Sequence, residues 1–223
     1  MKQIIIERNI FKKSDEVTEK NKNILREKGV YIINLLGSPG CGKTTLLENI
    51  IVNLKDKLNI AVIQGDLYTA KDGERIEKHG IEVVQINTSN ICHLDSLAVE
   101  KAIEKINIEN VDLLIIENIG NLICPAFYDL SEDIRIVVTS VTEGNHKVEK
   151  YPEIFKSSSS IVLNKIDLLS YTDFDLNGFY NDIRRINKDA KVINISCIDK
   201  VGISNLCTFI LKEIKKSNVH KIS

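Results

Sequence analysis

One short loop of the chain has the residues needed to hold phosphate groups. Residues 37–44 read GSPGCGKT and match the pattern G-x-x-x-x-G-K-[ST], between an apolar run and an amphipathic segment. The glycines let backbone N–H groups face phosphate oxygens, and a helix that begins here adds a favourable dipole. Lys43 would reach the β and γ phosphates of a nucleoside triphosphate, and the Thr44 hydroxyl would join a Mg²⁺ shell. The residues predicted to contact nucleotide here are Gly37, Ser38, Gly40, Cys41 (through its N–H), Gly42, Lys43, Thr44 and Thr45.

A second motif points to guanine as the base. The run NKID, which ends at Asp167, directly follows the apolar run SIVL and resembles the N-K-x-D motif of GTPases. The Asp167 carboxylate only accepts hydrogen bonds, so it can take two from guanine, whereas adenine would leave it facing an unpaired acceptor. Asn164 would brace the loops, and the Lys165 stem would cover the base. Ser196 and Cys197 follow the last predicted strand, where GTPases contact guanine O6, although Ser196 could equally be a helix N-cap.

Three acidic residues could complete the phosphate site. Asp66 and Asp72 lie in GDLYTAKDGER after one predicted strand, and Glu117 ends another. Carboxylates at strand ends beside a phosphate loop suit Mg²⁺, although such residues also cap helices or solvate loops. We therefore expect Thr44, Asp66, Asp72 and Glu117 around Mg²⁺, and Lys43, Asp66 and Glu117 in catalysis. No glutamine occupies the usual water-orienting position and no arginine finger is evident, which predicts slow intrinsic hydrolysis.

Three soft metal ligands lie outside these motifs. Cys92 and His93 are adjacent, just before an amphipathic segment, and Cys124 lies in the loop ENIGNLICP that begins at Glu117. Both stretches follow predicted strands, so they should meet at one end of the sheet. A thiol at a helix start is more readily a thiolate, and thiolate with imidazole suits Zn²⁺, Ni²⁺ or copper. Taken alone, the pattern also fits buried cysteines and a capping histidine, because the spacing is no zinc-finger pattern.

The elements that must position these residues follow an alternating pattern from Gly29 onward. Strand-like and helix-like segments in alternation imply a mainly parallel sheet covered on both faces. The predicted fold is therefore α/β, a three-layer P-loop NTPase with about seven strands flanked by helices, with ligands bound beyond the carboxyl ends of the strands. The predicted strands span 31–36, 60–63, 83–86, 111–116, 134–140, 160–164 and 191–196, and the predicted helices span 44–54, 93–106, 175–186 and 203–216.

The first 29 residues have a different pattern from the rest of the chain. Apolar residues form one stripe on an otherwise charged segment, which predicts an N-terminal helical extension over 1–29, followed by a GTPase domain over 30–223. The stripe would pack on the protein's own domain. The alternative is that it forms a contact between subunits of an oligomer. Its members are Ile10, Phe11, Val17, Ile24 and Leu25.

Composition excludes several classes of protein. The chain has 223 residues and a formal net charge of −1 with both signs interspersed, which disfavours nucleic acid as a partner. No apolar stretch approaches the length of a membrane span or a signal peptide, so we expect a cytoplasmic protein without a membrane partner. The five cysteines are odd in number and widely spaced, which disfavours a disulfide framework.

Taken together, the motifs resemble one family. In this order and spacing, GSPGCGKT, GD at 65–66, CHLD, ENIGNLICP and NKID resemble the HypB family, nickel-inserting GTPases of [NiFe]-hydrogenase maturation. The likeness runs from about Gly29 to the C-terminus, and CHLD with ENIGNLICP is its specific part. It implies GTP or GDP, Mg²⁺, and Ni²⁺ or Zn²⁺ as cofactors, with metal bound by Cys92, His93 and Cys124 at the dimer interface between two GTPase domains. The implied partners are a second copy in the GTP state, a HypA-type nickel chaperone and the precursor of a hydrogenase large subunit.

Ligand number supports a dimer hypothesis. Three ligands per chain leave a tetrahedral or square-planar ion unfilled, so water or a second chain must complete the shell. We expect GTP to favour a metal-sharing dimer and hydrolysis to release the metal. Many bacterial members also begin with a cysteine-rich or histidine-rich nickel motif, which this chain lacks, so the Cys/His site would be its only metal site.

Three other functions are compatible with parts of the pattern. A urease-type nickel accessory GTPase shares the phosphate loop and N-K-x-D motif, but the CH…C arrangement disfavours it. A regulatory GTP-binding switch would use its cysteines structurally and would carry no stoichiometric metal. A small-molecule kinase needs no guanine-specific loop, so NKID argues against it.

Overall fold

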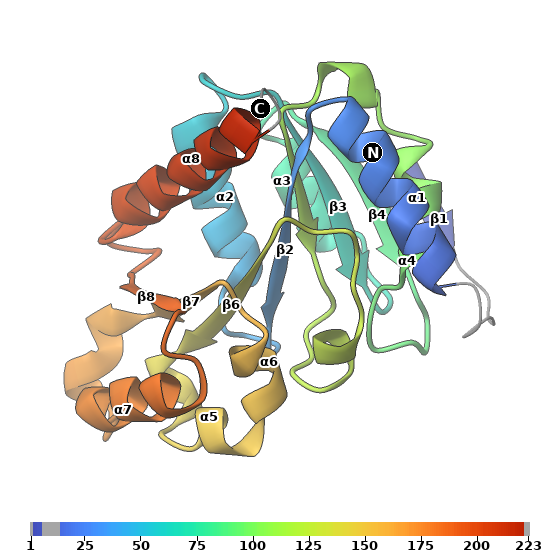
Figure 1. The fold of residues 1–223 in the computed structure, drawn as a ribbon. Helices are drawn as coiled ribbons and strands as arrows, with labels where there is room; N and C mark the ends of the chain where they lie inside the picture. The colour runs from blue at the N-terminus through green and yellow to red at the C-terminus, as the bar shows by residue number, and fades with distance from the viewer. Residues whose placement is uncertain (1, 6–13, 221–223) are drawn as a thin grey trace.

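One parallel sheet organises the chain in this computed structural model, which describes residues 2–5 and 14–220. Eight strands follow the order β1-β4-β3-β5-β2-β6-β7-β8, and every neighbouring pair is parallel (Figure 1). The predicted α/β fold is confirmed, and seven of the strands are those predicted from the sequence. The strands are β1 (Lys2–Ile5), β2 (Tyr31–Gly37), β3 (Ile60–Asp66), β4 (Glu82–Asn87), β5 (Leu113–Glu117), β6 (Ile134–Ser140), β7 (Ser160–Asn164) and β8 (Lys191–Asn194).

Helices cover both faces of the sheet, as an all-parallel sheet requires. One face packs on α2 and α8, with α3 beside α2, and the opposite face packs on α1 and α4 at one side and on α5, α6 and α7 at the other. The helices are α1 (Ser14–Glu27), α2 (Lys43–Leu54), α3 (Lys71–Glu77), α4 (Ser96–Ile103), α5 (Lys147–Lys150), α6 (Pro152–Lys156), α7 (Leu176–Ile186) and α8 (Ile203–His220). Short 3₁₀ turns are η1 (Ile108–Asn110), η2 (Cys124–Phe127), η3 (Val141–Glu143) and η4 (Ile166–Tyr171).

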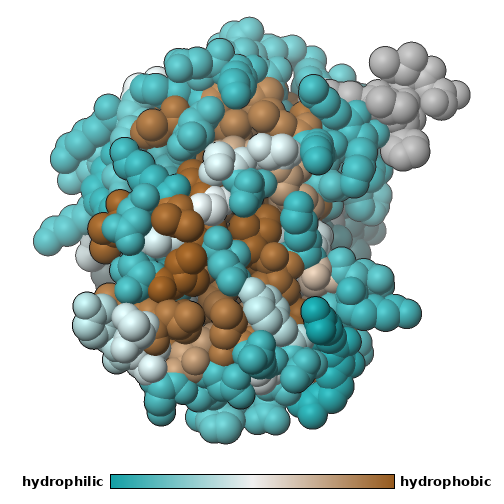
Figure 2. Space-filling model, turned by 90° about the vertical axis from the view of Figure 1, so that its left-hand side faces the viewer, coloured by the Kyte–Doolittle hydropathy of each residue, from teal (hydrophilic) through white to brown (hydrophobic). Residues whose placement is uncertain are grey.

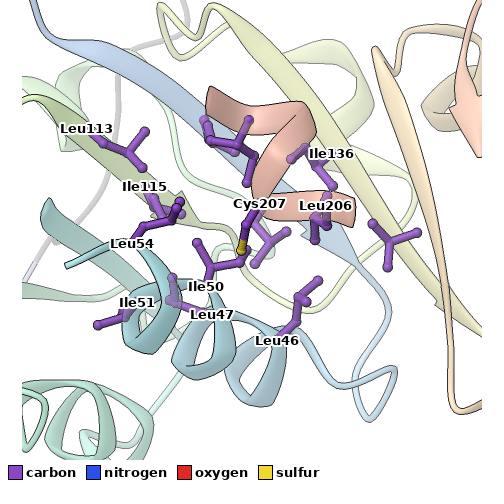
Figure 3. Close-up of a cluster of buried hydrophobic side chains, with 14 of the residues drawn as sticks. Leu46, Leu47, Ile50, Ile51, Leu54, Leu113, Ile115, Ile136, Leu206 and Cys207 are labelled. Atoms are coloured by element: carbon purple, nitrogen blue, oxygen red, sulfur yellow. The ribbon is translucent and has the colours of Figure 1, made fainter. Parts of the chain in front are cut away.

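The core beneath α2 fixes the helix that carries the phosphate loop. Apolar residues of α2 recur at helical spacing and point toward the sheet and α8, where Leu113, Ile115 and Cys207 meet them (Figure 3). Leu46, Leu47, Ile50, Ile51 and Leu54 are all at most 1% exposed. The N-terminus of α2 is therefore held rigidly at the carboxyl end of β2, since displacing the helix would expose this surface.

The N-terminal segment differs in part from the prediction. A helix was predicted over 1–29, but residues 2–5 form strand β1 beside β4, and the helix α1 begins at Ser14. Thr18 Oγ1 lies 2.5 Å from Ser96 Oγ of α4, and Leu25 is fully buried. Leu25 of the apolar stripe therefore packs on the protein's own domain, while Val17 and Ile24 are half-buried. Ile10 and Phe11 lie outside the described residues.

The parallel arrangement gathers the loops after β2, β3, β5, β6 and β7 at one edge of the sheet (Figure 1). Figure 2 views the molecule from the left-hand side of Figure 1 and shows apolar surface surrounded by hydrophilic residues. The loop between β8 and α8 lies on that side and exposes Ile198 and Val201.

None of the helices in the described part of the chain is long and apolar enough to span a membrane.

Candidate functional site

The predicted phosphate loop connects β2 to α2 in a conformation that requires glycine. Gly40 and Gly42 have φ angles of +77° and +98°, in the left-handed region that other residues rarely adopt. A Cβ atom at Gly42 would also collide with the side-chain amide of Asn164. Because Gly42 has no side chain to cap α2, the first N–H groups of the helix stay available to phosphate oxygens.

Lys43 lies in the loop with its ammonium turned back onto backbone carbonyls. Its Nζ donates to the carbonyls of Gly37 at 3.0 Å and Ser38 at 3.1 Å, and the residue is only 8% exposed. Phosphate oxygens can replace these carbonyls without moving the lysine out of the loop. The Ser38 hydroxyl donates to Glu143 of η3, which ties the phosphate loop to the end of β6.

Asn164 joins the phosphate loop to the loops after β7 and β8. Its Nδ2 donates to the carbonyl of Cys41 at 2.9 Å, and its Oδ1 accepts the N–H groups of Lys165 at 2.7 Å and Cys197 at 3.3 Å. Lys165 has a φ of +60°, and its Nζ reaches the carbonyl of Gly40 at 2.8 Å. The NKID motif and the phosphate loop therefore form one connected structure.

The other predicted base contacts lie on either side of this connection. Asp167 is half-buried in the first turn of η4. The buried Ser196 hydroxyl accepts the N–H of Asp199 at 3.1 Å, while α8 begins only at Ile203, so Ser196 closes a turn and is not the N-cap of α8. Burial raises the pKa of the Cys197 thiol to about 11, so the thiol stays neutral. The backbone of Cys197, and not its side chain, therefore provides the polar groups at this position.

Glu117 lines a cavity of about 650 Å³ beside the phosphate loop. It is 3% exposed, and its Oε1 accepts the Thr44 hydroxyl at 2.7 Å. Its Oε2 is buried without a hydrogen-bond partner among the described residues. Burial raises the pKa of this carboxyl to about 7, although Lys43 and Thr44 oppose the rise. A buried carboxylate oxygen with a free lone pair beside a threonine hydroxyl fits a divalent cation.

The other two predicted acids line the same cavity but have different partners. Asp66 Oδ1 accepts the N–H groups of Tyr68 and Thr69, both at 2.8 Å, so this carboxylate also shapes the turn after β3. Asp72 lies in the first turn of α3 and pairs with Arg75 at 3.1 Å. The positions of Asp66 and Asp72 fit both roles that the sequence suggested, which are to shape the loop and to bind a cation.

Arg75 is a cavity residue that the sequence interpretation missed. Its guanidinium pairs with Glu48 of α2 at 2.5 Å and approaches the Thr45 hydroxyl at 3.4 Å. It therefore connects α3, with Asp72, to the helix that follows the phosphate loop. The i, i+3 spacing of Asp72 and Arg75 was a usable signal, but it needed α3 to be recognised as a helix.

The three predicted soft ligands come together at the neighbouring loops. The sulfur atoms of Cys92 and Cys124 lie 3.0 Å apart, and with a ring nitrogen of His93 the ligand atoms lie within 4.8 Å of one another. All three residues are half-buried, and within the described part of the chain no other group of three such side chains is assembled this way. Helix α4 begins at Ser96, capped by Asp95, so Cys92 precedes the helix rather than starting it.

Tyr128 supports His93 in a way that the sequence did not predict. The two rings stack with centroids 3.9 Å apart and an interplanar angle of 19°. Burial lowers the pKa of His93, which favours the neutral imidazole that binds metals, and its Nδ1 has no hydrogen-bond partner among the described residues. Stacking therefore replaces the hydrogen bond that commonly orients a metal-binding histidine.

Removing this stack should weaken metal binding. We expect Tyr128→Ala to lower Ni²⁺ affinity by about tenfold, because His93 would lose its fixed orientation. Tyr128→Phe keeps the ring and should bind as the unmodified protein does. Isothermal titration with Ni²⁺ measures both variants, and equal affinities for the alanine variant and the unmodified protein would contradict the role of the stack.

The fold and the phosphate loop define a P-loop nucleotide-binding protein. The sequence profile of the CobW/HypB/UreG nucleotide-binding domain matches residues 31–194. The chain is 45% identical over 211 residues to the probable hydrogenase maturation factor HypB of Methanocaldococcus jannaschii, covering 95% of this chain and 96% of that protein. It is 38% identical to HypB of Escherichia coli K12, covering 89% of this chain and 68% of that protein. The chain therefore belongs to the CobW/HypB/UreG family, within its HypB branch.

Solved structures agree with this assignment. The crystal structure of HypB from Helicobacter pylori in complex with nickel has a TM-score of 0.87 and 34% identity, and covers 92% of this chain and 96% of that chain. HypB from Archaeoglobus fulgidus has a TM-score of 0.85 and 37% identity, covering 91% and 98%. The signal recognition particle receptor FtsY of Elizabethkingia anophelis, at 14% identity and a TM-score of 0.55, shares the fold alone.

Proposed function

We propose that the protein is a GTP-hydrolysing metallochaperone that binds and delivers nickel during [NiFe]-hydrogenase maturation. The observation that carries this proposal is the cluster of Cys92, His93 and Cys124 at the same sheet edge as the phosphate loop. Relatives named hydrogenase maturation factors and a nickel complex of HypB support it.

The nucleotide site supplies a GTPase. In this proposal the phosphate loop binds the phosphates, and Asp167, with the loop at Ser196 and Cys197, selects guanine. Thr44, Asp66, Asp72 and Glu117 would hold Mg²⁺, which would supply positive charge to offset the negative charge that develops during hydrolysis. Lys43 stabilises that charge on the γ phosphate. We expect slow hydrolysis, because the sequence has no glutamine at the usual water-orienting position.

The cysteine and histidine cluster receives Ni²⁺ as cargo. Two thiols and one imidazole suit nickel or zinc. The hydrogen bond that the Cys92 thiol donates to the Cys124 sulfur is the main cause that raises the pKa of Cys92. Metal binding must therefore displace protons from the thiol pair. Because the three ligands leave the shell incomplete, a second copy in the GTP state, or water, completes it.

Cysteine burial favours this proposal over a switch whose cysteines are structural. Cys92 and Cys124 are partly exposed, whereas Cys41, Cys197 and Cys207 are buried in the core. A structural role would place the first pair in the core as well. The proposed partners are a HypA-type nickel chaperone, which would supply the metal, and a hydrogenase large-subunit precursor, which would accept it in the cytoplasm.

Measuring metal affinity and mass in each nucleotide state tests the proposal. We expect Ni²⁺ to bind about tenfold more tightly with a non-hydrolysable GTP analogue than with GDP, a coupling of ordinary size. Light scattering should show the mass of a dimer with Ni²⁺ and the analogue, and the mass of a monomer with GDP. Equal affinity and equal mass in both states would contradict the proposed cycle.

A further inference from the structure

The loop after β5 touches both the nucleotide cavity and the metal cluster. Residues 117–120 line the cavity, and Gly120 lies so close to the phosphate loop that a Cβ atom there would be 2.9 Å from Pro39 Cγ. The next residue, Asn121, forms an isolated antiparallel bridge with Gly37. The backbone at Asn121 is therefore held directly by the first residue of the phosphate loop.

The side chain of Asn121 holds the two cysteine loops. Its Nδ2 donates to the Cys92 carbonyl at 3.2 Å, and its Oδ1 accepts the N–H of Ile123, the residue before Cys124, at 2.9 Å. One side chain therefore sets the spacing of the two thiols that the metal needs.

Asn118, the other asparagine of this loop, has a different set of contacts. It is 1% exposed, its N–H donates to the Leu35 carbonyl at 3.0 Å, and its Nδ2 lies 3.4 Å from Asn34 Oδ1. Both of these partners belong to the central strand β2, and the Asn118 Oδ1 accepts the N–H of Leu94, next to His93, at 3.3 Å. Asn118 therefore ties the His93 loop to the framework of the sheet and has no hydrogen bond to Cys92 or Ile123. Asn121 is half-buried and is bonded to loops on both sides, which allows it to shift when the loop shifts.

We propose that Asn121 is the positioning residue that couples the nucleotide state to the geometry of the metal cluster. This inference rests on the proposed function, since it requires that nucleotide changes metal affinity. A γ phosphate beside residues 117–120 displaces that segment, the bridge at Gly37 transmits the displacement to Asn121, and its amide then changes the separation of Cys92 and Cys124. Coupling of this kind is reciprocal, so the metal must change GTP affinity by the same factor.

Two substitutions at this position separate coupling from simple stability. Asn121→Ala removes both hydrogen bonds, and Asn121→Asp keeps the acceptor for Ile123 but loses the donor to Cys92. Asn53→Ala is the matched control, because Asn53 lies on the exposed side of α2 and donates only to the Asn49 carbonyl one turn away, at 2.8 Å. Melting temperatures establish that each variant is folded.

The quantity to measure is the ratio of Ni²⁺ dissociation constants with GDP and with a non-hydrolysable GTP analogue. We expect a ratio of about tenfold in the unmodified protein and in Asn53→Ala, and about twofold or less in both Asn121 variants. The effect of Ni²⁺ on analogue affinity should fall by the same factor. A ratio preserved in both Asn121 variants would overturn this inference alone. A ratio of one in the unmodified protein would overturn the proposed function, and this inference with it.

Discussion

Replacing Cys124 with serine is expected to weaken Ni²⁺ binding by about 100-fold or more, because loss of a direct ligand should cost at least as much as loss of an outer-shell partner. The thiolate is the soft donor that selects nickel or zinc, and a serine hydroxyl neither ionises at neutral pH nor matches a soft cation. The sulfur atoms of Cys124 and Cys92 lie 3.0 Å apart and form the pair of sulfur donors in the cluster. Removing the Cys124 thiol therefore leaves only one sulfur donor.

Competition titration with a chromophoric chelator measures this loss. Cys207→Ala is the control, because Cys207 lies on α8 with its thiol buried in the core and is not part of the cluster. GTP binding should persist in Cys124→Ser, since the phosphate loop is intact. In the unmodified protein Ni²⁺ affinity should rise with pH, because protons held by the thiol pair compete with the metal. Unchanged Ni²⁺ affinity in Cys124→Ser would exclude the cluster as the metal site.

Much of the fold and of the site could be predicted because both depend on short local patterns. GSPGCGKT needs its glycines and lysine at fixed spacing, and apolar runs such as 111–116 mark buried strands directly. Parallel strands place all their carboxyl ends together, so the position of Cys124 after β5 was enough to bring it near Cys92. The resemblance to HypB then supplied the metal role, which spacing alone left open.

The features that were missed depend on contacts between loops. Asn121 and Tyr128 matter because of what they touch, and neither belongs to a periodic pattern. Helix α3 is short and has Gly73 inside it, so its sequence shows no clear helical spacing of apolar residues. Without that helix, the pairing of Arg75 with Asp72 could not be predicted. Strand β1 is short and was overlooked because the apolar residues around it also fit a helix.

Replacing Glu117 with glutamine is expected to stabilise the protein when Mg²⁺ and nucleotide are removed. Burial raises the pKa of this carboxyl to about 7, so the ionised form is costly in the folded state. Relative to an ordinary carboxyl, the shift corresponds to roughly 3 kcal/mol of unfolding free energy above neutral pH. Glutamine keeps the acceptor for the Thr44 hydroxyl and carries no charge, so it escapes this cost.

The sign of the pH dependence distinguishes this effect from a general change in packing. The folded pKa exceeds the unfolded one, so the folded state of the unmodified protein holds a proton that the unfolded state releases between about pH 4.5 and pH 7. Its stability relative to Glu117→Gln therefore falls across that window and reaches its full deficit above pH 7. In EDTA at pH 8 the variant should melt about 6–12 °C higher, and at pH 5 the gap should nearly close.

The exposed Glu153→Gln variant on α6 serves as the control and should show no such difference between the two pH values. An equal or lower melting temperature for Glu117→Gln at pH 8 would contradict the prediction.

Catalysis should change in the opposite direction. With Mg²⁺ and GTP, Glu117→Gln is expected to hydrolyse GTP about 100-fold more slowly, a usual consequence of losing a precisely placed group. The charge that destabilises the empty site is the charge that a divalent cation neutralises, since Glu117 Oε2 is buried with no partner among the described residues. The stability that this buried carboxylate costs is therefore recovered only when cation and nucleotide enter. A variant that was both more stable and fully active would separate Glu117 from the cation site.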